Sequence, residues 1–388
     1  MKPKNIDINS LKEQFATMQT KDDIVHLLNN AKNLLYQKEC EPFKLKALTY
    51  YANPNICTKR YKTFTIKKKS GSYRTINAPV KGLKSMLRAL NFVLQSIYEP
   101  HENSTGFVLN KSIVDNANKH IGKNYVFNLD LKDFFHSFDR NRVKFGFMQE
   151  PFNLKGEKEP LAFLLASLCT HPFDIEGELK TVLPQGSPTS PTITNILCKK
   201  LDRRLNGLAN RFGATFTRYA DDITFSSSHN IFNKDEFHKE LKRIIEEDQK
   251  LNINPKKTRL QKTGYRQEVT GLIVNQKANV HKRYLKQIRM WIYFWERYGY
   301  EKAQQIFKKD YIADKGHVKN INSQLINVLD GKLEFLKMVK GSENNTYKKL
   351  KERFDKLSSK NDPLNELLNI WENQGIENAI EHYYSKKN

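Results

Sequence analysis

The stretch YVFNLDLKDFF (125–135) decides the fold, because it predicts a β-strand that carries an acid close to its end. Between Tyr125 and Leu131 two faces alternate with the period of two that a strand requires. One face is entirely apolar, and Asp130 lies on the other. We therefore expect Asp130 near the carboxyl end of a strand.

A second pair of extended runs occurs in FTRYADDITF (216–225), where two acids interrupt the apolar pattern. This pattern predicts a β-hairpin with Asp221 and Asp222 at its tip. Another period-two pattern, YKTFTIKKKSGSYRTI (61–76), is broken by Ser-Gly-Ser and predicts a basic hairpin. Helical spacing separates these strands, so the order of elements predicts an α+β fold with antiparallel strands.

Three regions follow from the patterns along the 388 residues. Residues 1–60 have helical spacing with polar gaps and predict an N-terminal helical extension. Residues 61–280 contain the predicted strands, and residues 281–388 are almost entirely helical. The length fits two or three domains, or one elongated catalytic unit.

The chain is strongly basic, with 66 Lys and Arg against 42 Asp and Glu and a formal net charge of +24. This charge is typical of proteins with a polyanionic partner, although a generally basic surface is the alternative. Ten Lys and Arg and no acid lie between Lys59 and Arg88. Ten more, opposed by Glu268 alone, lie between Lys256 and Arg289. Two such stripes favour a groove that follows a nucleic-acid backbone.

The sequence shows no pattern of a disulfide framework, a zinc cluster or a membrane segment. Its four cysteines are scattered without a CxxC pair. The polar start MKPKNIDINS (1–10) is unlike a signal peptide, and the longest apolar run (161–169) is too short to cross a bilayer. We therefore expect a soluble, cytoplasmic protein with no membrane partner.

The adjacent aspartates at the predicted hairpin tip indicate a metal site. Like charges so close raise each other's pKa unless a cation compensates them. Carboxylate oxygens suit hard cations such as Mg²⁺. With Asp130 as a third acid, Asp221 and Asp222 could hold two ions about 3.5 to 4 Å apart, as phosphoryl transfer requires. An isolated pair of aspartates would be interpreted as an ordinary turn, but the neighbouring motifs favour the metal site.

Three strings give these acids a family context. In chain order, LDLKDFF (129–135), LPQGSPTSP (183–191) and RYADD (218–222) resemble the palm motifs of reverse transcriptases. TFTIKKKSGSYRTINAP (63–79) matches the family pattern as well, so the resemblance covers about residues 61–290. It implies a right-hand polymerase fold, with fingers and palm in 61–280 and a helical thumb in 281–388.

The resemblance implies a role for each matched residue. Asp130 and Asp221 would bridge two Mg²⁺ ions, with Asp222 as a weaker partner. The Leu131 carbonyl would bind the nucleotide-bound ion. Further residues would contact the incoming deoxynucleotide or the primer. These are Lys67 and Arg74 at the triphosphate, Phe135 as a steric gate against a ribose 2′-OH, Gln185 and Gly186 beside the nucleotide, and Tyr219 at the primer terminus.

Two short strings narrow the resemblance to bacterial retron reverse transcriptases. NANKH (116–120) resembles their NAxxH signature, and Val269-Thr270-Gly271 resembles their VTG signature. We predict that Asn116, His120 and residues 269–271 take part in RNA recognition. A structural role is the alternative for the histidine, and strand packing is the alternative for the valine.

A retron enzyme implies a particular substrate and partner. It recognises a structured non-coding RNA, uses dNTPs, and copies part of that RNA into a branched, RNA-linked single-stranded DNA. The family further implies antiviral defence with a separate effector protein. The alternatives are a group II intron or diversity-generating reverse transcriptase, or an RNA-binding antitoxin scaffold.

Overall fold

The computed structural model describes residues 5–67, 71–175, 177–315, 323–360, 370–372 and 375–385. The chain divides into two compact units. The first comprises residues 1–270 and 274–276, and the second comprises residues 271–273 and 277–388. The predicted boundaries at residues 60 and 280 stay predictions.

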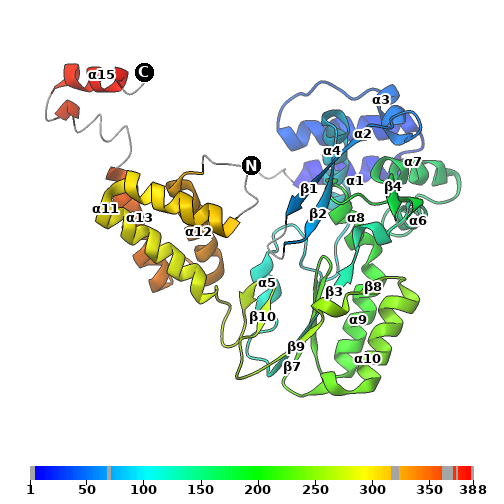
Figure 1. The fold of residues 1–388 in the computed structure, drawn as a ribbon. Helices are drawn as coiled ribbons and strands as arrows, with labels where there is room; N and C mark the ends of the chain where they lie inside the picture. Colours follow the sequence, from blue (N-terminus) through cyan, green and yellow to red (C-terminus); the bar gives the residue numbers. More distant parts are fainter. Residues whose placement is uncertain are drawn as a thin grey trace. The chain divides into compact units, whose positions relative to one another are not determined.

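An antiparallel sheet forms the centre of the first unit (Figure 1). Its path runs β6-β7-β3-β8, and β9 also pairs with β3. These strands are β3 (Tyr125–Lys132), β6 (Thr215–Tyr219), β7 (Asp222–Ser227), β8 (Asn252–Ile253) and β9 (Arg259–Lys262). The structure therefore confirms the predicted strand around Asp130, the predicted acidic hairpin and the α+β class with antiparallel strands.

Two further hairpins belong to the first unit. They pair β1 (Tyr61–Lys67) with β2 (Tyr73–Pro79), and β4 (His171–Ile175) with β5 (Glu178–Val182). The first of these is the predicted basic hairpin. Lys68 and Lys69 of its basic run lie outside the described residues. A short strand, β10 (Glu268–Val269), lies near the end of the unit.

Ten α-helices surround these strands in the described part of the first unit. They are α1 (Asn5–Thr17), α2 (Lys21–Tyr36), α3 (Leu45–Ala52), α4 (Lys81–Ile97), α5 (Ile113–Asn118), α6 (Arg140–Met148), α7 (Glu159–Cys169), α8 (Ser190–Leu197), α9 (Lys199–Arg211) and α10 (Asp235–Lys242). One apolar core joins residues of the N-terminal helices to residues of β3, β6 and β7. The helices of residues 5–52 therefore stabilise the same unit that carries the sheet.

The second unit is helical, as predicted. Its elements are β11 (Leu272–Ile273), α11 (Lys282–Lys315), α12 (Leu325–Lys340), α13 (Asn345–Lys360) and α15 (Ile376–Ser385). Gly299 interrupts α11 with φ 77° and ψ 169°, a conformation that glycine adopts without steric cost. Buried Trp291, Trp295 and Leu333 belong to the apolar interior of this unit. None of the helices in the described ranges combines the length and apolar character needed to cross a membrane.

Candidate functional site

Backbone pairing brings the three predicted acids to one end of the central sheet. Asp130 of β3 lies opposite Asp222 of β7 in the antiparallel register. The backbone N–H of Leu131 donates to the Asp221 carbonyl over 3.0 Å, so the hairpin tip is fixed beside β3. Residues separated by about ninety positions along the chain thus form one acidic cluster.

A left-handed residue creates the turn that carries the acids. Ala220 has φ 59°, a conformation that costs a residue with a Cβ atom about 1 kcal/mol or more. The Arg218 guanidinium donates to the Ala220 carbonyl over 3.1 Å, which stabilises this turn. The strained turn therefore has a specific partner in the protein.

The local electrostatics are unfavourable for three ionised carboxylates. Removal of water by the surrounding protein raises the pKa of Asp221, and the nearby charge of Asp130 raises it further. The same desolvation, with the charges of Asp221 and Asp130, raises the pKa of Asp222 to about 6. Burial and like charges both favour the protonated form, and a bound cation would reverse this preference.

Asp130 has two polar partners that the sequence did not reveal. The Lys257 ammonium lies 2.7 Å from one carboxylate oxygen of Asp130, and the Asn254 side-chain amide donates to the other over 3.0 Å. The Asp130 side chain is 7% exposed, whereas that of Lys257 is 57% exposed. The solvent-exposed Lys257 ammonium therefore places a positive charge next to the acidic cluster.

The donor set fits Mg²⁺, although the acids are not arranged as a closed metal cage. Within the described residues, no group of three or more Asp, Glu, His or Cys side chains is gathered closely enough to hold a metal ion. The Asp130 carboxylate is bonded instead to Lys257 and Asn254. Carboxylate oxygens prefer hard cations, and burial together with the neighbouring negative charges raises the pKa values of Asp221 and Asp222, a rise that a bound cation would oppose. Metal binding would therefore replace the Lys257 ammonium at Asp130.

The basic hairpin carries the two residues predicted to contact the triphosphate. Lys67 and Arg74 are exposed near the open end of β1 and β2, where Arg74 lies opposite Ile66. The positive charge of Arg74 also lowers the pKa of Asp221, so this guanidinium acts electrostatically on the acidic cluster. The placement of Arg74 is compatible with a ligand that bridges the hairpin and the acids.

The two adjacent phenylalanines after β3 have different environments. Phe134 is buried with 3% of its surface exposed, whereas Phe135 is only half-buried. Their ring centroids lie 5.7 Å apart in an edge-to-face contact. Phe135 is therefore the one of the pair that remains partly accessible, as its predicted role requires.

Gly186 lies where a side chain would not fit. It has φ +124°, and a Cβ atom there would lie 2.8 Å from the Asn77 carbonyl oxygen. The adjacent Gln185 carbonyl accepts a hydrogen bond of 2.8 Å from the Asn77 N–H on β2. The loop is thus held against the β1–β2 hairpin, and glycine is required by this close approach.

Tyr219 ends β6, directly before the turn. Its backbone lies opposite Asp222 in the hairpin register. Its ring is half-buried and lies 6.3 Å from the ring of Phe107. The predicted primer contact is therefore next to the acids.

Asn116 and His120, which we predicted to take part in RNA recognition, lie inside the protein. They are 1% and 0% exposed, and both are hydrogen-bonded inside the protein. Burial raises the cost of protonating the imidazole and lowers the pKa of His120 to about 3. This burial agrees with the structural role that was the alternative for the histidine, and the part of the pair in RNA recognition stays a prediction.

The VTG residues combine packing with unusual backbone conformation. Val269 is fully buried in β10. Thr270 has φ 46° and Gly271 has φ 80°. The Thr270 hydroxyl accepts from the Asn116 amide over 3.4 Å, which brings residues of the two signatures together. Val269 therefore has the packing role that was its alternative.

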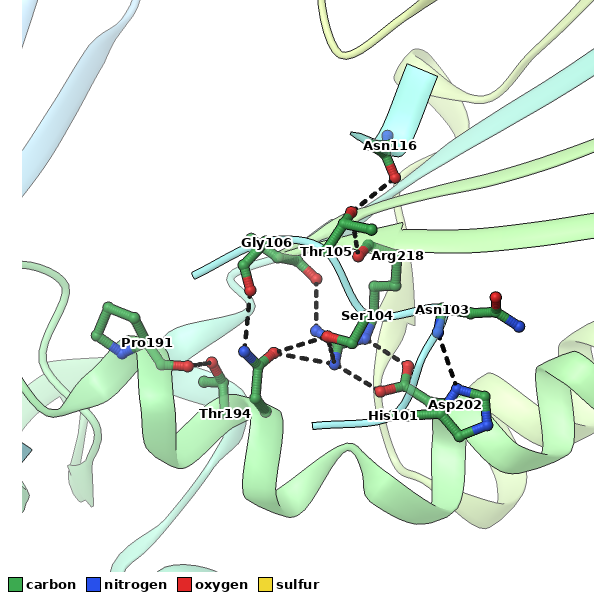
Figure 2. Close-up of polar contacts among 12 residues, drawn as sticks. His101, Asn103, Ser104, Thr105, Gly106, Asn116, Pro191, Thr194, Asp202 and Arg218 are labelled. Atoms are coloured by element: carbon green, nitrogen blue, oxygen red, sulfur yellow. Dashed lines mark hydrogen bonds and ion pairs between the residues drawn. The ribbon is translucent and has the colours of Figure 1, made fainter. Parts of the chain in front are cut away.

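A second polar group, also missed by sequence reasoning, surrounds Arg218, which precedes the acidic turn in the chain (Figure 2). Arg218 is fully buried and forms an ion pair with Asp202 of α9, with N–O distances of 2.6 and 2.7 Å. It also donates to Ser104 and Asn195. Nothing local in the sequence marks this pair, because Asp202 stands in the charged run KKLDRR and Arg218 stands beside Thr217 and Tyr219.

Comparison with protein families gives one match that covers more than half of the chain. Residues 66–285 match the family described as "Reverse transcriptase (RNA-dependent DNA polymerase)". The matched region contains β3, the acidic turn and the loop at Gly186.

Several bacterial proteins are similar in sequence. The chain is 39% identical over 249 residues to the retron Mx162 reverse transcriptase of Myxococcus xanthus, covering 60% of this chain and 50% of that protein. It is 33% identical to the retron Mx65 reverse transcriptase of the same species, covering 74% and 63%. It is also 33% identical to the retron Ec86 reverse transcriptase of Escherichia coli, covering 71% and 81%. The chain thus spans half to two thirds of the Myxococcus proteins and most of the Escherichia protein.

Among solved structures, a telomerase from Candida albicans in complex with a telomeric RNA fragment is similar at a TM-score of 0.42 and 12% sequence identity. The match covers 77% of this chain and 63% of that one. A likeness of this size has no bearing on the chemistry of the site.

Proposed function

The chain belongs to the retron reverse transcriptases, and from this premise we propose that it is an RNA-directed DNA polymerase that copies part of a structured RNA into DNA. The observation that supports this activity best is the meeting of Asp130, Asp221 and Asp222 at one end of the sheet. Uncompensated carboxylates beside a basic hairpin suit a reaction between phosphates and metal ions.

In this proposal Asp130 and Asp221 hold two Mg²⁺ ions, with the Leu131 carbonyl and Asp222 as further ligands. When bound, the metal ions supply activation of the primer hydroxyl and neutralisation of the leaving pyrophosphate. The side chains contribute charge and geometry. For Asp130 to hold a metal ion, the Lys257 ammonium would have to leave its carboxylate.

Other residues bind and select the nucleotide. Lys67 and Arg74 bind the triphosphate, because guanidinium and ammonium groups donate to phosphate oxygens. The half-buried Phe135 ring occupies the space that a ribose 2′-OH would need. Gln185 and Gly186 bring backbone close to the nucleotide, and Tyr219 contacts the primer terminus.

The finer architecture is a right hand. The β1–β2 hairpin with its neighbouring helices would form the fingers, the central sheet with α8, α9 and α10 the palm, and the helices after residue 281 the thumb. The two basic stripes would bind the two sides of the RNA–DNA duplex, since both carry a strong excess of positive charge.

The biological product would be a branched, RNA-linked single-stranded DNA made in the cytoplasm. Synthesis would begin from a 2′-OH of the structured RNA, and the enzyme with its product would serve antiviral defence together with a separate effector protein. This part of the proposal rests on membership of the retron family.

Co-expression of the protein with its flanking genomic DNA tests the proposal. Nucleic acid would be extracted, treated with RNase and a debranching enzyme, and compared between wild type and Asp221→Ala/Asp222→Ala. We expect a short single-stranded DNA whose mobility changes on debranching and which is absent from the double variant. Asp235→Ala, an exposed acid in the first turn of α10, is the matched control and should leave the product unchanged.

Two results would redirect the proposal. Primer extension by the purified protein without any branched DNA in cells would favour a group II intron or diversity-generating enzyme. Absence of both activities would favour an RNA-binding scaffold.

A further inference from the structure

His120 connects the two strands of the acidic hairpin. Its Nε2 atom lies 2.7 Å from the Thr217 hydroxyl on β6, and its Nδ1 atom lies 2.7 Å from the Ser226 hydroxyl on β7. His120, Thr217 and Ser226 are 0% exposed. A neutral imidazole has one donor and one acceptor, so each ring nitrogen bonds one hydroxyl. The imidazole therefore links the two strands of the acidic hairpin through one hydrogen bond to each.

Asn116 reaches the same hairpin through Thr105. The Thr105 hydroxyl lies 2.8 Å from the Asn116 carbonyl oxygen and 3.2 Å from the Arg218 carbonyl. The Thr105 N–H donates to that Arg218 carbonyl over 2.9 Å, and the Arg218 N–H donates to the Asn103 carbonyl over 2.9 Å. Residues 103–105 thus lie along β6 as an additional extended segment (Figure 2).

The side chain of Arg218 continues this connection to the turn itself. Its guanidinium is paired with Asp202 and bonded to the Ala220 carbonyl (Figure 2). Gly106 closes the contact, since a Cβ atom there would lie 2.5 Å from the Ala220 backbone nitrogen. Little space remains in which Ala220 could change conformation. The position of Asp221 is therefore determined by buried polar groups on one side of the turn.

We propose that Asn116 and His120 are positioning residues for the catalytic turn, acting through Thr105, Thr217 and Arg218, and that they do not contact RNA. The inference rests on the proposed polymerase activity and extends it to two residues of the NANKH signature, Asn116 and His120, whose side chains are buried. Removal of the Thr105 or the Thr217 hydroxyl leaves a buried hydrogen-bond partner unsatisfied. The loss costs free energy and allows the turn to shift. A small displacement of reacting groups is enough to slow a reaction by tenfold or more.

Thr105 offers a matched pair of variants. Thr105→Val removes the hydroxyl at nearly constant volume, whereas Thr105→Ser retains it. Both would be assayed with the purified full-length protein in single-turnover extension of a DNA primer on an unrelated RNA template. We expect Thr105→Val to lower the rate by about tenfold and to raise the Mg²⁺ concentration for half-maximal rate. Thr105→Ser should restore both quantities.

Thr217, which bonds His120, offers a second and independent pair of variants. Thr217→Val removes the partner of His120 Nε2, and Thr217→Ser retains a hydroxyl. The same changes in rate and Mg²⁺ dependence are expected. Thermal unfolding of each variant, measured beside the assays, normalises the rates to folded protein.

RNA binding separates positioning from recognition. The probe is RNA transcribed from the DNA that flanks the gene, and its Kd is measured without dNTPs. We expect the valine variants to bind it as wild type does. Weaker RNA binding with an unchanged rate on the unrelated template would overturn the inference, as would wild-type rates per folded molecule in both valine variants. If wild type extends no primer, the proposed function fails rather than this inference.

Discussion

Two polar regions meet at the RYADD turn and differ in how their charges are compensated. On the open side, Asp130, Asp221 and Asp222 repel one another, and the Lys257 ammonium is bonded to Asp130 alone of the three. On the buried side, Arg218 is paired with Asp202 by two hydrogen bonds. The comparison indicates that the buried side is complete as folded, whereas the open side requires a cation.

The difference agrees with a division between support and chemistry. A buried polar network that is fully hydrogen-bonded is rigid, because any rearrangement leaves a group unsatisfied. The like charges of the acidic cluster repel one another, and a bound metal ion can relieve that repulsion. The RYADD motif therefore contributes Arg218 to the rigid buried network and Asp221 and Asp222 to the acidic cluster. Substitutions can perturb the two separately.

The largest expected effect comes from breaking the buried side. Asp202→Asn would leave the Arg218 guanidinium buried without its carboxylate, which typically costs about 3–5 kcal/mol of unfolding free energy. Chemical denaturation of the purified protein measures this loss. The control is Glu240→Gln, which removes the partner of the exposed Arg243 and should cost less than about 1 kcal/mol. Equal losses in the two variants would contradict the comparison.

The next effect comes from the open side. Asp221→Asn should lower the rate of primer extension by about 10²–10³, because it removes charge at the reacting centre. Its thermal stability without metal should not decrease, since repulsion among the acids is relieved. A strongly destabilised Asp221→Asn would show instead that this carboxylate supports the fold.

A smaller effect is expected at Lys257. Lys257→Met removes the ammonium that competes with a metal for Asp130, so binding of Mn²⁺ should become several-fold tighter, about 1 kcal/mol. Titration calorimetry in the absence of nucleic acid measures this affinity. Unchanged or weaker binding would show that Lys257 does not compete at this carboxylate.

The smallest effect concerns pH. The folded-state pKa values of Asp221 and Asp222 are raised, that of Asp222 to about 6. Groups with raised carboxyl pKa values oppose folding when ionised, so their destabilising contribution should diminish as the pH falls from 7 towards 4. Unfolding of the metal-free protein across this window, compared with Asp222→Asn, measures the contribution. The variant should show a weaker pH dependence.

The sequence predicted the open side well, because local patterns carry it. Period-two alternation located β3, and an interrupted pair of extended runs located the acidic hairpin. Of the two phenylalanines, the resemblance implied a steric-gate role for Phe135, and it is the half-buried one. The resemblance placed Gln185 and Gly186 beside the predicted nucleotide site, and Gly186 does lie where only glycine fits.

The side-chain pairs around the turn, on both sides of it, were not predictable in the same way. His120 bonds residues 97 and 106 positions away, and Lys257 bonds Asp130 across 127 positions. No local periodicity encodes such pairs, because they arise when separate strands and helices come together. The types and spacing of Asn116 and His120 likewise gave no information on their burial, and their part in RNA recognition stays a prediction.

The central claim is RNA-directed DNA synthesis at the acidic turn. Its most direct measurement is extension of a DNA primer annealed to RNA by the purified protein, with dNTPs and Mg²⁺, beside Asp221→Asn and the control Asp235→Ala. We predict extension by wild type and control, loss of extension in Asp221→Asn, and loss on chelation of Mg²⁺. Extension by Asp221→Asn at the wild-type rate, or none by folded wild-type protein, would contradict the claim.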